Sequence, residues 1–181
     1  MGEDVAAPTG ERLAMLRRLG FGELEHDSHV PFLSHLLGTR RLLVEWGERP
    51  AMCDAGLFHS AYGTEYFTPD EPASRAEVQA LIGDEAELVA WAWCTIHRDT
   101  IEPGPSGDAT AVDRHTGDTI ALDDELLADV ATLWAADTVE QIARMDVEER
   151  AFAHTLGRVL AYARPAARAA ALGVMALVDE R

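Results

Sequence analysis

The chain has 181 residues, 48% of them hydrophobic, which is enough for one domain with a full hydrophobic core. All fifteen basic residues are arginines, and 32 carboxylates bring the formal charge to -17. Because so acidic a surface repels phosphate backbones and anionic lipids, we expect neither nucleic acid nor a membrane as a partner.

Cysteine usage and the N-terminus predict the compartment. Cys53 and Cys94 each lie in an apolar helical segment without a CxxC spacing, so we expect reduced core residues. No uncharged run reaches the roughly 20 residues that span a bilayer, and the first residues lack a basic region followed by an apolar run. These features predict a cytoplasmic protein.

Helix signals dominate the first half of the chain. Gly20 and Gly47 end two predicted helices, and capping-box patterns at Ser74–Glu77 and Asp84–Glu87 open two more. We therefore expect helices over ERLAMLRRLG, VPFLSHLLGTRRLLVEWG and PAMCDAGLFHS, followed by two that end near Ile82 and His97.

The second half is also mainly helical. Residues 99–110 are rich in Pro and Gly and read as an irregular loop, after which alternation around residues 115–118 predicts a small β-hairpin. The segment DDELLADVATLWAADTVEQIAR is the most regular helix. A capping box at Asp146 opens a helix through about Tyr162, and Pro165 starts the last one. The chain thus predicts one all-α domain with a small hairpin insertion.

One carboxylate lies on the apolar stripe of the long helix. Asp137 continues the spacing of four hydrophobic residues, Leu126, Val130, Leu133 and Trp134. Burying an ionised carboxylate costs several kcal/mol unless it is paired, hydrogen-bonded or bound to a metal. Asp137 therefore needs a partner inside the bundle.

Three histidines lie on apolar faces of their own predicted helices. His35 follows Phe32 by one turn, His59 follows Ala55, and His97 follows Trp93. With Asp137, four helices would each direct one metal-ligand type inward, and this donor set suits Zn, Mn or Fe. The alternative to a metal site is that the histidines are core residues that only hydrogen-bond Asp137.

The pattern resembles the HD-domain superfamily, helical proteins whose metal ligands follow the order His, His-Asp, then a distant Asp. HLLGT would supply His35, AGLFHS would supply His59, and AADTVEQ would supply Asp137. The resemblance covers roughly residues 10–145, with C-terminal helices over 146–181. Four motifs also resemble a small, largely uncharacterised HD-like family: HLLGTRRLLVEWG, AGLFHSAYGTEYF, ALIGDEAE and RHTGD.

Ser60 departs from the superfamily pattern, because it stands where the doublet aspartate would bridge two ions. In HD-type oxygenases that hold two irons, two further histidines follow the doublet, and His97 and His115 fall in that interval. His115 sits in the predicted turn, where we expect a solvated side chain. The dipeptide His26-Asp27 precedes the first ligand helix and is not the doublet.

If a divalent transition metal binds His35, His59 and Asp137, an open coordination position remains, as in catalytic sites. The resemblance then implies a metal-dependent hydrolase acting on a small molecule, a phosphate ester or a nucleotide. Ser60 would hydrogen-bond the reacting water and Glu65 would move its proton.

Three further residues are candidates for contact with the substrate. Arg98 would hold an anionic group, although an exposed helix-end arginine is the alternative, and Tyr62 and Tyr66 would line the mouth of the site or pack.

Two other functions stay open at this point. A non-haem iron oxygenase would need His97 and His115 as true ligands, whereas a metal-free small-molecule binding protein is favoured by Ser60. The Ala-rich last helix either closes the bundle or forms the face of a homodimer.

Overall fold

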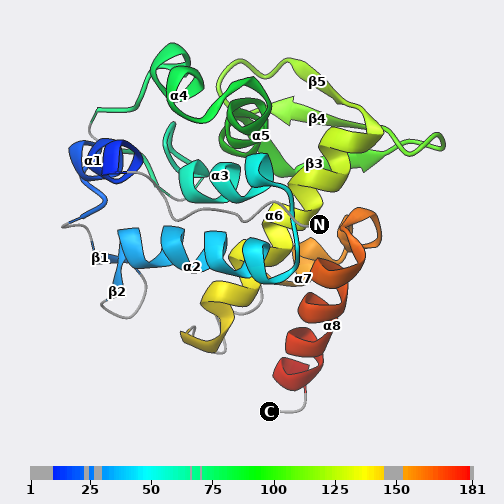
Figure 1. The fold of residues 1–181 in the computed structure, drawn as a ribbon. Helices are drawn as coiled ribbons and strands as arrows, with labels where there is room; N and C mark the ends of the chain where they lie inside the picture. The colour runs from blue at the N-terminus through cyan, green and yellow to red at the C-terminus, as the bar shows by residue number, and fades with distance from the viewer. Residues whose placement is uncertain are drawn as a thin grey trace. The chain divides into compact units, whose positions relative to one another are not determined.

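A computed structural model describes residues 10–22, 25–26, 30–65, 67–69, 71–144 and 153–179 (Figure 1). The chain divides into two compact units, Met1–Cys94 and Thr95–Arg181, and each is described by itself. None of the described helices combines the length and apolarity needed to cross a membrane.

The first unit is built from helices. A short antiparallel ribbon, β1 (Glu25–His26) with β2 (Val30–Pro31), precedes the second helix. The helices are α1 (Gly10–Arg18), α2 (Phe32–Glu45), α3 (Pro50–Phe58), α4 (Arg75–Ile82) and α5 (Asp84–Thr95). The first four begin and end close to their predicted boundaries, and α5 begins at its predicted start.

Local chemistry explains where these helices begin. Pro50 stands in the first turn of α3, where its missing N–H costs no hydrogen bond. The capping box that opens α4 is formed as predicted: the Ser74 hydroxyl accepts from the Glu77 N–H, and the Glu77 carboxylate accepts from the Ser74 N–H. Asp84 is itself the first residue of α5, so its carboxylate lies in the first turn, where the helix dipole favours it.

Helices α2 and α3 pack against each other at Gly56. A Cβ at this position would stand 2.4 Å from Leu43 Cδ1 and 3.6 Å from Thr39 Cγ2. A larger residue here would require the Leu43 side chain or the helices to shift. The contact brings together the two helices that carry the predicted histidine ligands.

The core of the first unit is apolar and partly aromatic. Phe21 and Phe32 stack with ring centroids 5.0 Å apart, and Phe67 lies 4.8 Å from Phe32. Around them pack buried residues of the helices: Leu16, Leu36, Leu57, Phe58, Val78, Ala86 and Ala90.

The second unit begins with a three-stranded antiparallel sheet in the order β3-β4-β5. Its strands are β3 (Ile96–Pro103), β4 (Ala109–Asp113) and β5 (Thr119–Leu122). The predicted hairpin is confirmed as β4 and β5, with Val112 opposite Thr119 and Gly117 in the turn at φ +79°. The described residues are thus mainly helical, with a small sheet inserted.

Strand β3 corrects two predictions. The sequence predicts residues 96 and 97 at the end of a helix, but both lie in β3. It predicts an irregular loop over residues 99–110, but residues 99–103 lie in β3 and residues 109–110 in β4. Ile96, Thr100 and Ile101 favour a strand, and β3 pairs with β4 at residues 96–97 and again at 102–103, on either side of an irregularity in the register. The side chains of Ile96 and Arg98 are buried, and those of His97 and Asp99 are exposed.

The helices of the second unit pack around α6 (Asp124–Gln141), which η1 (Ile142–Arg144) extends. The predicted helix from Asp146 lies partly outside the described residues, which contain a short α7 (Ala153–Leu156) followed by η3 (Leu160–Tyr162). The last helix, α8 (Pro165–Asp179), begins at the predicted proline.

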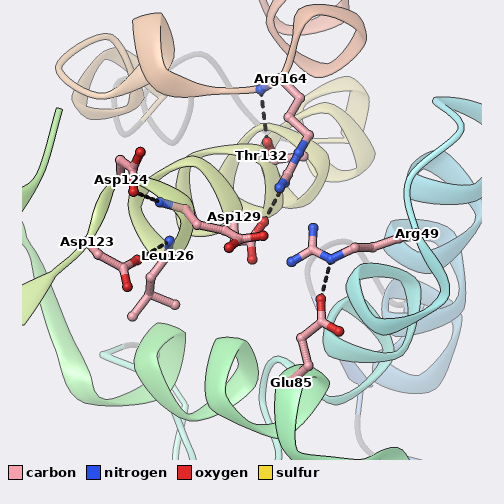
Figure 2. A network of polar contacts seen from close by, with 9 residues as sticks. Arg49, Glu85, Asp123, Asp124, Leu126, Asp129, Thr132 and Arg164 are labelled. Carbon is pink, nitrogen blue, oxygen red and sulfur yellow. Dashed lines mark hydrogen bonds and ion pairs between the residues drawn. The ribbon is translucent and has the colours of Figure 1, made fainter.

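Polar contacts fix the ends of these helices (Figure 2). The Asp123 carboxylate caps α6 by accepting from the Leu126 N–H at 2.8 Å. Just before α8, the Arg164 backbone N–H donates to the Thr132 hydroxyl, and its guanidinium donates to the Asp129 carboxylate. In the first unit, Figure 2 shows Arg49 paired with Glu85.

Candidate metal centre

Two buried histidines from neighbouring helices face each other. His35 on α2 is 1% exposed, and His59, the residue that ends α3, is 2% exposed. Their Nε2 atoms lie 3.1 Å apart, and the rings are nearly perpendicular at 88°. The prediction that both side chains turn inward is confirmed.

A hydrogen bond within α3 fixes the tautomer of His59. Its Nδ1 lies 2.6 Å from the carbonyl oxygen of Gly56. Because a carbonyl only accepts, Nδ1 carries the proton and donates it. In the neutral ring the lone pair is then on Nε2, the atom that faces His35.

The spacing of the two Nε2 atoms fits two ligands of one ion. With metal–nitrogen bonds of 2.0–2.1 Å, two adjacent ligands stand about 2.8–3.0 Å apart at octahedral angles and about 3.3–3.4 Å apart at tetrahedral angles. The observed 3.1 Å lies between these two ranges, within about 0.3 Å of either. Without an ion, the same separation makes a hydrogen bond in which His35 Nε2–H donates to His59 Nε2.

Aromatic side chains hold the two imidazoles in place. Phe32 meets the His35 ring edge to face at 5.8 Å, and Trp93 meets the His59 ring in the same way at 6.0 Å. The rings are therefore fixed by packing while the Nε2 atoms keep their orientation toward each other.

The loop after His59 has a defined conformation. Ser60 is buried, and Gly63 takes φ +81° at a place where a Cβ would stand only 3.1 Å from the Phe67 carbonyl oxygen. The Thr64 N–H donates to that carbonyl, and the Phe67 N–H donates to the Thr64 hydroxyl. Glu65, which follows Thr64 in this turn, is half-buried. Tyr66 lies outside the described residues.

Asp137 is buried on α6, as the apolar stripe predicts, with 8% of its surface exposed. Gln141 Nε2, one turn later, donates to its Oδ1 at 2.8 Å. An amide N–H satisfies one lone pair of a carboxylate, but it does not neutralise the negative charge. A cation bound to the carboxylate would therefore stabilise the buried group further.

The helical position predicted for His97 is wrong, because the residue lies in a strand. His97 lies on the exposed side of β3. His115 is exposed in the hairpin turn, as predicted, where its backbone N–H donates to Asp113.

Arg98 is neither at a helix end nor exposed. It lies on the buried side of β3, with its guanidinium carbon 5.8 Å from the centre of the Trp134 ring. The guanidinium therefore makes a cation–π contact with the indole.

Tyr62 belongs to a polar network that the sequence did not reveal. Its hydroxyl donates to Glu87 Oε1 at 2.8 Å, and Arg75 binds both oxygens of the same carboxylate. The Arg75 guanidinium also lies 4.4 Å from the Trp91 ring centre. Burial and the bond to Glu87 raise the pKa of the Tyr62 phenol, so it stays protonated and acts as a donor.

Tyr62→Phe should lower the free energy of unfolding by about 1–2 kcal/mol, because buried Glu87 loses one donor and keeps Arg75. Urea unfolding followed by circular dichroism measures the change. The matched control is Tyr162→Phe, on a half-buried tyrosine of η3. Equal stabilities for Tyr62→Phe and the native chain would show that the hydroxyl adds nothing.

Comparisons with known proteins agree with this architecture. Residues 15–98 match the model of a family described as a domain of unknown function, DUF6817. No curated protein matches the sequence significantly. A solved structure of a metazoan ortholog of SpoT, described as hydrolysing ppGpp and acting in starvation responses, is similar with a TM-score of 0.58 and 12% identity. The match covers 95% of this chain and 97% of that one, and confirms the predicted resemblance to HD-domain proteins at the level of the fold.

Proposed function

We propose that this protein is a metal-dependent hydrolase that cleaves a small phosphate ester or a nucleotide. The observation that carries the proposal is the buried pair of His35 and His59, whose Nε2 atoms are 3.1 Å apart. The fold similarity to a protein described as hydrolysing ppGpp supports a nucleotide substrate.

In this proposal His35, His59 and Asp137 bind one divalent ion of Fe, Mn or Zn. Two neutral imidazoles and one carboxylate form a donor set that these metals accept, and three protein ligands leave a coordination position open. Such an ion, when bound, supplies a Lewis acid and lowers the pKa of a water molecule. The Gly56 carbonyl keeps the lone pair of His59 on Nε2, and Gln141 holds one oxygen of Asp137.

The remaining candidates would act on the water and the substrate. Ser60, buried next to His59, would hydrogen-bond the attacking water, and Glu65 in the closed turn would take its proton. Arg98 would balance the charge of a phosphate group. Tyr62 and Tyr66 would border the substrate. With Ser60 in place of a bridging aspartate, we propose one ion and not two.

Hydrolysis is better supported than oxygenation by the positions of the other histidines. An iron oxygenase with two ions needs His97 and His115 as further ligands, but both side chains are exposed, one on β3 and one in a turn. We therefore propose a single hydrolytic ion held by His35, His59 and Asp137.

The test is turnover of a substrate panel by protein loaded separately with Mn²⁺, Fe²⁺ and Zn²⁺. The panel includes ppGpp, nucleoside mono- and triphosphates and p-nitrophenyl phosphate, with products resolved by ion-exchange chromatography. We expect release of phosphate or pyrophosphate from at least one nucleotide, and a loss of more than about 100-fold in kcat for Asp137→Asn.

A matched control is Asp129→Asn on the same helix, since Asp129 is also buried but pairs with Arg164. This variant should lose stability and keep its turnover. Absence of turnover with every metal and substrate, or an Asp137→Asn enzyme as fast as the native one, would overturn the proposed hydrolase.

A further inference from the structure

Two consecutive residues near the end of α5 both contact His59. The Cys94 thiol donates to the His59 carbonyl oxygen at 3.0 Å, and the Trp93 ring packs edge-on against the His59 ring. Cys94 is fully buried and His59 nearly so. This contact joins residues 35 positions apart in the sequence.

The position of His59 explains why such a donor is needed. His59 follows the last residue of α3, and the final carbonyls of a helix have no N–H partner within the helix. A buried carbonyl left without a hydrogen bond destabilises the fold. The Cys94 thiol donates to the His59 carbonyl from another helix, and it holds the main chain of His59 at the same time.

We propose that Cys94 is a positioning residue for the metal centre, acting through the His59 main chain. The inference rests on the proposed metal site. The His59 carbonyl is held by Cys94, the ring proton on Nδ1 by Gly56, and the ring edge by Trp93. Together these contacts place Nε2 at 3.1 Å from His35.

Removing the thiol releases one of the three restraints on this ligand. The α3 terminus can then relax, and Nε2 moves relative to His35. Groups outside the coordination sphere that orient a ligand are typically worth about 10- to 100-fold in metal affinity. Since Cys94 acts through the backbone and two restraints remain, we expect a loss of about 10-fold.

Cys53 is a matched control within the same unit. It is equally buried, and its thiol also donates to a backbone carbonyl, that of Glu48 at 3.6 Å. Burial raises the pKa of the Cys53 thiol to about 11, so it too remains protonated. Replacing Cys53 deletes the same atoms from the core at a place where no ligand is held.

The experiment is titration of the purified protein with Co²⁺, followed by the visible absorption of the bound ion. Cys94→Ala removes the donor, Cys94→Val removes it while filling the space, and Cys94→Ser retains a hydroxyl donor. Each is compared with Cys53→Ala and with the native chain, and urea unfolding gives the stability of each variant.

We expect Cys94→Ala and Cys94→Val to bind Co²⁺ about 10-fold more weakly with altered absorption bands, and Cys94→Ser to recover most of the affinity. Cys53→Ala should bind as the native chain does, even with a similar loss of stability. Equal affinity for Cys94→Val and the native chain, or an equal loss in Cys53→Ala, would overturn the role of Cys94.

A separate outcome distinguishes failure of the metal site itself. If the native chain binds neither Co²⁺ nor the other metals, the proposed function fails first, and long-range ¹H–¹⁵N spectra of the imidazoles then test the positioning directly. Cys94→Val should shift the His59 nitrogens and Cys53→Ala should not. Unchanged His59 signals in Cys94→Val would contradict the positioning role without reference to any metal.

Discussion

Alanine in place of His35 or of His59 should lower the affinity for a divalent metal by more than about 100-fold, because each removes a direct nitrogen ligand and even supporting groups are worth 10- to 100-fold. The two Nε2 atoms face each other at 3.1 Å, so neither histidine can replace the other. Isothermal titration with Mn²⁺ and Zn²⁺, together with metal content after dialysis, measures the loss.

Two exposed histidines provide matched controls for this prediction. His97→Ala on β3 and His115→Ala in the hairpin turn remove the same chemical group from the surface. Both variants should keep the native affinity. If His97→Ala loses as much metal as His59→Ala, the ligand set proposed above is wrong and the oxygenase alternative regains support.

Stability must be measured alongside, because both ligands are core residues. In His59→Ala the Gly56 carbonyl loses its donor and the ring of Trp93 loses a packing partner. We expect the free energy of unfolding to fall by about 2–4 kcal/mol. A folded variant with native circular dichroism and no metal would separate the loss of the ligand from the loss of the fold.

Gly56→Ala should destabilise the protein by about 1–3 kcal/mol, although alanine favours a helix over glycine. The new methyl group would stand 2.4 Å from Leu43 Cδ1, and Leu43 is fully buried. Its side chain would have to leave its rotamer inside a filled core, or α3 would have to move away from α2. Urea unfolding measures the cost.

The matched control for Gly56→Ala is Gly173→Ala on α8, where no atom lies within 4 Å of the added methyl. Here only helix propensity acts, and the variant should gain up to about 1 kcal/mol. When Gly56→Ala is combined with Leu43→Ala, the loss should be smaller than the sum of the two single losses, since the clash is between these two side chains. A Gly56→Ala protein as stable as the native one would show that α2 and α3 adjust freely.

The same substitution should also weaken metal binding. Gly56 supplies both the close contact between the helices and the carbonyl that accepts from His59 Nδ1. Displacement of α3 changes the distance between the two Nε2 atoms, which now suits one ion. A single glycine in α3 thus links helix packing to the geometry of the proposed site.

Much of the helical fold and the burial of three candidate ligands could be predicted from local patterns. Proline, glycine and capping-box positions mark helix ends through interactions within one turn, so the boundaries of α1 to α4 follow from the sequence. His35 and Asp137 continue apolar stripes at helical spacing, and burial of both is confirmed. The periodicity of hydrophobic residues indicates which face of a helix is buried. That information is sufficient to predict the burial of these two side chains.

The failures share one physical cause, which is contact between distant segments. The helical pattern predicts that the helix continues to His97, but residues 96 and 97 pair with β4 instead. Such pairing with a distant strand cannot be predicted from neighbouring residues. The role of Glu87, assigned to a helix cap, likewise depends on Tyr62, 25 residues away. The contact between Cys94 and His59 is another such pair.

The central claim is that the buried histidines belong to a metal centre, and elemental analysis by mass spectrometry tests it most directly. The measurement uses untagged protein purified without chelator. We predict about one equivalent of iron, manganese or zinc per chain, held through dialysis. A chain that carries no metal, and takes up none when these ions are offered back, would contradict the claim and leave His35 and His59 as a hydrogen-bonded pair in the core.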